Sequence, residues 1–171
     1  TDTSAVGPML VKALNNKMAE LNIPVLLETT AKQILVNDEG AVCGVVAVDK
    51  DGKEMTIDCT AVILATGGFG ANAEMVEEYK PDLAGFGTTN HAGATGDGIT
   101  MAKELGAEFV DMEQIQTHPT VNPETQTMYT EGVRGNGAIL VNKEGKRFVN
   151  ELETRDVVSA AILEQTDGQC Y

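Results

Sequence analysis

The run Ala61-Val62-Ile63-Leu64-Ala65-Thr66-Gly67-Gly68 carries the strongest single signal for the fold. Its first five residues are all apolar, which is typical of a short strand buried on both faces of a parallel sheet. Two glycines follow almost at once, and glycine turns easily because it has no Cβ and tolerates positive φ. The run therefore predicts an α/β fold in which a buried strand ends in a glycine-rich turn.

The residues before this run predict a helix and a β-meander. Apolar residues recur at helical spacing from a hydroxyl cap at Thr3 or Ser4 as far as Leu21, and Asn22 and Pro24 end the helix. Short strands separated by turn residues follow at 24–27, 31–36, 42–49 and 54–58. We therefore expect an α/β sheet into which a β-meander is inserted.

The residues after the run predict shorter elements. Helices are expected at 73–79 and at about 98–105, with a long loop rich in Gly, Thr and Asn between them. A hairpin is expected at 138–149, and a last helix begins after Thr154. Because polar loops become frequent from about Glu113, we place a domain boundary near Met112.

Composition limits the classes of partner. The chain has 171 residues with 26 acidic and 12 basic side chains, a net charge of −14, so nucleic acid is a poor partner. No apolar run approaches the roughly 20 residues of a membrane span. Only three basic residues are arginine, and all three lie in one short stretch: Arg134, Arg147 and Arg155.

The three cysteines carry no recognisable site. Cys43, Cys59 and Cys170 form no C-x-x-C motif, so the sequence predicts no metal site and no haem attachment. Cys43 and Cys59 lie in apolar, strand-like stretches and are expected to be core thiols. The chain begins at Thr1 and shows no signal peptide, so we expect a processed protein or an excised piece.

Two glycine-rich turns are candidates for ligand binding. Ala65–Gly68 and Ala94–Gly98 would each let backbone N–H groups approach a ligand, and the second opens a helix whose N-terminus favours anionic groups. Asp97 either caps that helix or accepts a bond from a ribityl or ribose hydroxyl. The alternative is a pair of ordinary tight turns, and no G-x-G-x-x-G motif is present.

A second group of residues suits a small dicarboxylate. Arginine offers a rigid fork of donors that matches a carboxylate, and a histidine and a hydroxyl would add further donors. The residues are His118, Thr130, Glu131, Arg134 and Arg155. The spacing of Glu131 and Arg134 also allows an ion pair within one helical turn.

Structural roles for these residues stay open. Arg155 would equally form a salt bridge at the start of its helix, and His118 would serve as a loop histidine. Arg147 is expected to be a solvated or paired surface residue, and His91 is expected to have a loop role.

Several ordered motifs carry a resemblance to a known family. They are Thr66-Gly67-Gly68-Phe69, Thr95-Gly96-Asp97-Gly98, Gln116-Thr117-His118-Pro119-Thr120, Thr130-Glu131-Gly132-Val133-Arg134-Gly135 with Gly137-Ala138, Arg147-Phe148-Val149-Asn150-Glu151 and Thr154-Arg155-Asp156. Over nearly its whole length the chain resembles the flavoprotein subunit of fumarate reductases and succinate dehydrogenases. The short gap between Arg147-Phe148 and Thr154-Arg155-Asp156 favours the soluble flavocytochrome c type.

The resemblance implies noncovalently bound FAD. Residues 1–112 would be the central part of an FAD-binding, Rossmann-like domain, and 113–171 the N-terminal part of an α+β capping (clamp) domain. The implied cofactor contacts are the backbone of Ala31 together with Ala65, Thr66, Gly67, Gly68, Thr95, Gly96 and Asp97. A haem would lie on a segment outside this chain.

The resemblance also implies a reaction, the reduction of fumarate to succinate. His118, Thr130 and Glu131 would bind the substrate carboxylates. Hydride would come from flavin N5 and the proton from Arg155, which Glu131 and Arg134 would reprotonate as a relay.

Two alternatives remain open. One is a flavin reductase of another unsaturated acid, such as an acrylate. The other is a non-catalytic internal fragment, because the N-terminal ADP-binding segment and the C-terminal part of the family are missing from these residues. A cytochrome or quinol-linked electron donor and a bacterial periplasmic location are implied by the resemblance alone.

Overall fold

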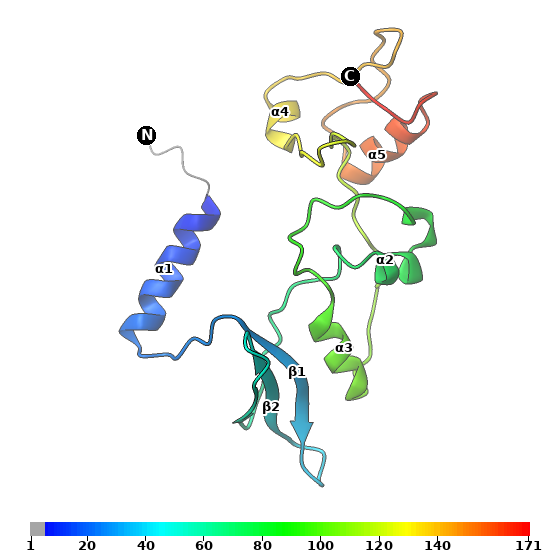
Figure 1. The fold of residues 1–171 in the computed structure, drawn as a ribbon. Helices are drawn as coiled ribbons and strands as arrows, with labels where there is room; N and C mark the ends of the chain where they lie inside the picture. Colours follow the sequence, from blue (N-terminus) through cyan, green and yellow to red (C-terminus); the bar gives the residue numbers. More distant parts are fainter. Residues whose placement is uncertain (1–5) are drawn as a thin grey trace. The chain divides into compact units, whose positions relative to one another are not determined.

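The computed structural model describes residues 6–171 and divides into two compact units. The first unit ends at Ile63 and the second covers Leu64–Tyr171. The first contains α1 (Val6–Glu20), β1 (Thr29–Val36), β2 (Val42–Asp49) and β3 (Glu54–Asp58). The second contains α2 (Ala73–Tyr79), a 3₁₀ turn (Pro81–Leu83), α3 (Asp97–Glu104), α4 (Glu131–Gly135) and α5 (Arg155–Leu163) (Figure 1). No helix in residues 6–171 is long and apolar enough to cross a membrane.

The first helix is confirmed where the structure describes it. The predicted cap at Thr3 or Ser4 lies outside the described residues. At the other end Asn22 adopts a positive φ of 53°, which asparagine tolerates and which stops the helix as predicted. None of the residues of α1 is buried.

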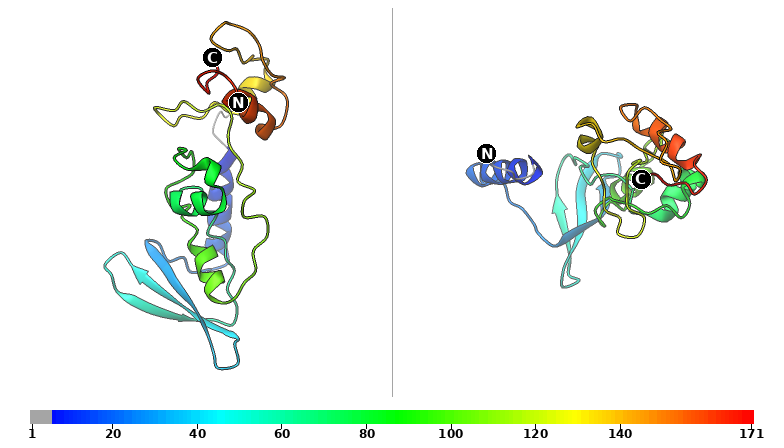
Figure 2. Two further views of the ribbon diagram at one scale, coloured as in Figure 1. Left: turned by 90° about the vertical axis from the view of Figure 1, so that its right-hand side faces the viewer. Right: turned by 90° about the horizontal axis from the view of Figure 1, so that it is seen from above.

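The predicted meander is confirmed. β1, β2 and β3 form one three-stranded antiparallel sheet in that order (Figure 2). Its turns are specified locally, because Asp49 Oδ1 accepts hydrogen bonds from the N–H groups of Asp51 and Lys53, both at 2.9 Å. Gly52 takes the positive φ of 80° that this turn requires.

Two predicted strands are absent from the described residues. The segment 24–27 is irregular, and 61–65 is not a strand either, with Ile63 91% exposed. A strand of a parallel sheet forms only between hydrogen-bonded neighbours, and no other segment of residues 6–171 pairs with 61–65. The fold is therefore mixed helix and strand as predicted, but its one described sheet is the antiparallel meander. The core-thiol prediction is also wrong: Cys43 is exposed and Cys59 is only half-buried.

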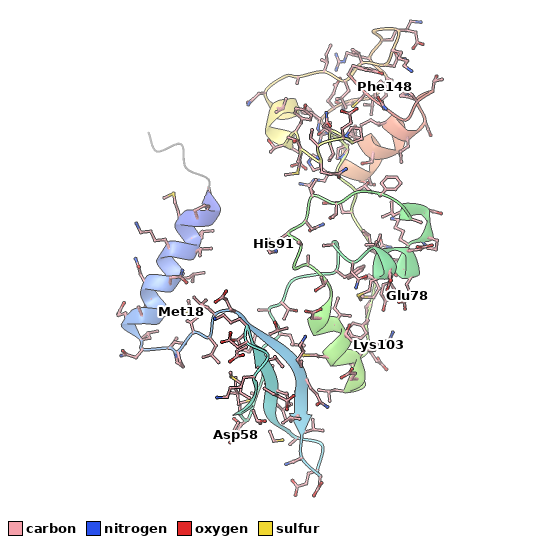
Figure 3. The ribbon with its side chains drawn as sticks, in the orientation of Figure 1. Met18, Asp58, Glu78, His91, Lys103 and Phe148 are labelled. Carbon is pink, nitrogen blue, oxygen red and sulfur yellow. The ribbon has the colours of Figure 1, made fainter. Side chains whose placement is uncertain are left out.

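The second unit holds the larger apolar core. Leu140 packs with Val158 and Ile162 of α5, and the partly buried Phe148 (labelled in Figure 3) and Val149 lie against them. The predicted hairpin over 138–149 is reduced to a single bridge between Val141 and Arg147. This core fixes α5, whose first residue is Arg155, on the segment that precedes it.

Candidate functional site

The two glycine-rich turns lie side by side in the second unit. The N–H of Gly96 donates to the carbonyl of Gly68 at 3.1 Å, and the N–H of Ala71 donates to the carbonyl of Ala94 at 2.9 Å. Asn72, the N-cap of α2, donates from Nδ2 to the carbonyl of Thr95 at 2.9 Å. Turns that are about 30 residues apart in sequence therefore form one backbone cradle.

Close packing explains why two positions of this cradle are glycine. A Cβ on Gly98 would collide with Thr66 Oγ1, and one on Gly96, whose φ is +83°, would press on the side chains of Met75 and Phe69. Gly67 is different: it has a φ of +79°, and a Cβ at this position would meet nothing within 4 Å. Its backbone therefore stays open to a ligand.

The cradle also has a carboxylate at a helix start. Of the two roles left open for Asp97, the structure excludes capping, because Gly96 is the N-cap of α3 and Asp97 is its first residue. Asp97 is exposed and accepts a hydrogen bond from Thr95 Oγ1 at 2.8 Å. A shallow pocket of about 210 Å³ adjoins the cradle and is lined in part by Ala65, Thr66 and Gly67.

Ala31 is the one predicted cofactor contact in the first unit. It lies on β1 opposite Ala47, at a register shift between Ala31 and Gln33. The other seven predicted contacts all belong to the cradle in the second unit: Ala65, Thr66, Gly67, Gly68, Thr95, Gly96 and Asp97.

Arg155 and Glu131 join the starts of two helices. Glu131 is the first residue of α4 and Arg155 is the first residue of α5, the two helices labelled in Figure 1. Arg155 Nε donates a hydrogen bond to Glu131 Oε1. Arg155 Nη1 also donates to Gln116 Oε1 at 2.8 Å. The bond from Arg155 lowers the pKa of Glu131, and the same bond raises the pKa of Arg155. Both groups are therefore charged at neutral pH.

His118 is held as a neutral imidazole with one N–H group that has no hydrogen-bond acceptor among the described residues. Its Nδ1 accepts a hydrogen bond from the N–H of Thr120 at 3.3 Å. Burial lowers the pKa of His118, and the charge of Arg155 lowers it further. The proton of the neutral ring therefore lies on Nε2, a buried atom that has no hydrogen-bond partner among the described residues.

Arg134 is buried and does not pair with Glu131. The ion pair that the spacing of Glu131 and Arg134 allows does not form, because Glu131 bonds to Arg155 instead. Arg134 is 5% exposed, and its Nη1 donates to the main-chain carbonyl of Glu151 at 2.6 Å. Its Nε has no partner in residues 6–171. The charge of Arg134 reaches His118, whose pKa it also lowers.

A cleft of about 560 Å³ opens beside these residues. Both His118 and Arg155 line it, together with Gln116 and Ser159. Thr130 is the N-cap of α4, where its side chain makes no capping bond. The structure thus brings His118, Glu131 and Arg155 into one electrostatic group, and it places two of them on a cleft wall.

The remaining predictions concern Arg147 and His91. Arg147 is paired as predicted, through Nε and Nη2 with the carboxylate of Glu151. His91 (labelled in Figure 3) keeps its loop role, because its Nδ1 accepts from the N–H of Gly93 at 3.0 Å.

Sequence reasoning did not single out Gln116 and Glu151 as functional residues. Both occur inside quoted motifs, but only the fold shows that Gln116 contacts Arg155 and that Glu151 contacts Arg134. The opposite charges of Arg147 and Glu151, four positions apart, were the one available signal.

Comparisons with known proteins agree on one family. A family model described as FAD binding domain matches residues 2–170. The chain is 46% identical over 99% of its length to an NADH:fumarate oxidoreductase of Klebsiella pneumoniae (strain 342), of which it covers 18%. It is 44% identical over 88% of its length to a urocanate reductase of Eggerthella lenta, of which it covers 25%.

Solved structures are also similar to this chain in both fold and sequence. One of them is described as the open conformation of a flavocytochrome c3 fumarate reductase, with a TM-score of 0.79 and 40% identity. The match covers 96% of this chain and 29% of that one.

Proposed function

The chain belongs to the FAD binding domain family, and from that premise we propose that it is the part of a flavoenzyme that reduces fumarate to succinate. The observation that carries the proposal is the group of His118, Glu131 and Arg155, two of which line one cleft. The chain spans only 18% and 25% of the two relatives named above, so activity belongs to the longer polypeptide.

The cradle fits a nucleotide-like cofactor. Gly67 offers uncovered backbone at positive φ, Gly68 and Gly96 hold the two turns together, and the exposed Asp97 stands at the start of α3. In the proposal the cradle residues, with the backbone of Ala31, hold FAD noncovalently. When bound, FAD would supply the hydride for the reaction.

The substrate contacts follow from the donors that have no partner. His118 Nε2–H would donate to one carboxylate of the substrate, and the hydroxyl of Thr130 and the backbone beside Glu131 would hold the other. This assignment is supported by the buried, unpartnered Nε2 of His118, because such a donor costs free energy until an acceptor reaches it.

Arg155 is the proposed proton donor. As one alkene carbon gains a hydride, the other develops carbanion character and takes a proton from a guanidinium nitrogen of Arg155. The positive charge of Arg155 would stabilise the developing negative charge. Glu131 touches Nε and would return the proton, with Arg134 as the next group of the relay.

The domain division and the setting are part of the proposal. We place the central part of the FAD-binding domain at 1–112 and the N-terminal part of the capping domain at 113–171. A periplasmic location and a cytochrome or quinol-linked donor belong to the proposal, and the likeness to a protein described as a flavocytochrome c3 favours the cytochrome.

A second substrate class is favoured by one relative. Because the chain is also similar to a urocanate reductase, the alternative is reduction of a different unsaturated acid. The pair Thr130 and Glu131 beside His118 favours a dicarboxylate as the substrate.

A substrate panel tests the proposal. The longest natural polypeptide that contains this sequence is purified, its flavin spectrum recorded, and oxidation of a reduced viologen dye followed with fumarate, urocanate and acrylate in turn. We expect flavin to be present and fumarate to be the fastest acceptor. Turnover of urocanate or acrylate without fumarate turnover would establish the alternative, and absence of flavin would overturn both.

A further inference from the structure

The carboxylate of Glu151 is buried and fully occupied. Its side chain is 5% exposed and accepts three hydrogen bonds. The N–H of Leu140 donates to Oε1 at 2.9 Å, and Arg147 grips both oxygens, at 3.1 Å from Nε and 2.6 Å from Nη2. These bonds, that from Arg147 first, lower the pKa of Glu151 to about 2, so the group is charged at neutral pH. A buried charge with so many donors has one fixed position.

The main chain of the same residue holds Arg134. The carbonyl of Glu151 accepts from Arg134 Nη1 at 2.6 Å, although the two residues are 17 positions apart. No carboxylate of residues 6–171 forms an ion pair with Arg134. The orientation of this buried guanidinium therefore depends on where the Glu151 carbonyl lies.

The Glu151 side chain in turn fixes that carbonyl and the neighbouring core. Leu140, which donates to the carboxylate, packs with Val158 and Ile162 of α5. The first residue of α5 is Arg155. One carboxylate thus links the position of Arg134 to the helix that carries Arg155.

We propose that Glu151 is a positioning residue for proton delivery: its carboxylate, held by Arg147 and Leu140, fixes the carbonyl that orients Arg134. The inference rests on the proposed function, in which Arg134 belongs to the relay that reprotonates Arg155. Because Arg147 forms the ion pair with the Glu151 carboxylate, Arg134 donates only to the main-chain carbonyl of Glu151 within residues 6–171 and keeps an unpaired positive charge there.

The test compares variants of the longest natural polypeptide in the viologen assay with fumarate. Glu151→Gln keeps the shape but presents an amide NH₂ group to Arg147, and Arg147→Gln removes the fork. A positioned proton donor contributes about 10²–10⁴-fold to a rate. Because these variants would only misplace one group of the relay, we expect each to lower kcat by about tenfold. KM for fumarate and the flavin spectrum should stay unchanged, while the solvent deuterium isotope effect on kcat rises.

Two variants serve as controls. Glu153→Gln alters an exposed carboxylate two residues away that accepts from Asn150 Nδ2 at 3.0 Å, and it should leave kcat unchanged. Arg147→Lys keeps the positive charge but loses the bidentate fork, so its kcat should lie between those of the wild type and Arg147→Gln.

The outcomes separate the two hypotheses. A wild-type protein that does not reduce fumarate overturns the proposed function, and this inference with it. An active wild type with Glu151→Gln and Arg147→Gln within about twofold of its kcat overturns the inference alone. If the variants instead lose flavin and their KM for fumarate rises, Glu151 has a merely structural role. If Glu151→Gln fails to fold, Arg147→Gln decides, because Arg147 is 58% exposed and its replacement is tolerated more easily.

Discussion

Glu131 and Arg155 are 24 residues apart in sequence, yet their bond ties the first residue of α4 to the first residue of α5. Each helix thus presents a charged side chain from its N-terminus to the same place. In the proposed relay the Glu131 carboxylate, which is charged at neutral pH, would accept a proton and pass it to Arg155 after Arg155 has given one away.

Replacement of Arg155 tests its role directly. Arg155→Ala removes the proposed proton donor but touches no residue of the glycine cradle, so kcat for fumarate should fall by about 10²–10⁴-fold while flavin binding persists. The control is Lys146→Ala, which removes an exposed positive charge elsewhere. Turnover of Arg155→Ala close to that of the control would refute the assignment.

The titration of His118 should respond to its charged neighbours with opposite signs. Arg155 lowers the pKa of His118 and Glu131 raises it. Arg155→Gln should therefore raise that pKa, and Glu131→Gln should lower it. Histidine ring proton shifts followed by NMR against pH, with His118→Gln for assignment, measure both changes. Shifts of the same sign in the two variants would contradict the electrostatic group.

The pH dependence of stability should report Glu151. Its folded pKa of about 2 lies below its ordinary value of 4.5. The unfolded chain therefore binds the proton first, and the stabilisation is present above pH 4.5 and is lost as the pH falls towards 2. In Glu151→Gln this part of the loss should vanish. Melting temperatures from neutral pH to about pH 3, with Glu153→Gln as control, measure it. Equal acid sensitivity in both variants would exclude the effect.

Gly98→Ala tests the cradle. The new methyl group would collide with Thr66 Oγ1, so Thr66 and the adjoining turn must shift, and the ratio of flavin to protein absorbance should fall. Gly7→Ala is the matched control, because its Cβ meets nothing within 4 Å and alanine favours the helix by about 0.5–1 kcal/mol. Full flavin content in Gly98→Ala would rule out a close approach of cofactor to this turn.

Local chemistry explains what the sequence could predict. The meander was predictable because its turns are made by residues close in sequence, such as Asp49 bonding to Asp51 and Lys53. The two glycine turns could be picked out as candidates for ligand binding from their composition, and the structure adds why Gly96 and Gly98 are needed, because they pack against Met75 and Thr66.

Tertiary contacts explain what it could not. The apolar run 61–65 has strand composition, but composition supplies no hydrogen-bonding neighbour. Likewise, the spacing of Glu131 and Arg134 fits an ion pair that does not form. Arg134 donates to the main-chain carbonyl of Glu151 instead. Glu131 bonds to Arg155, which is more distant in sequence. Choice between competing partners depends on the fold, and no local pattern encodes it.

The first helix has a consequence for handling the protein. α1 has 15 residues, buries none of them, and exposes Val6, Leu10 and Leu14 along its length. Isolated helices of about 12–15 residues are marginal in water unless a face is covered. The helical signal in the circular dichroism spectrum should therefore report whether α1 is covered. We expect the contribution of α1 to be weak while its apolar side chains are exposed to solvent and strong once another surface covers them.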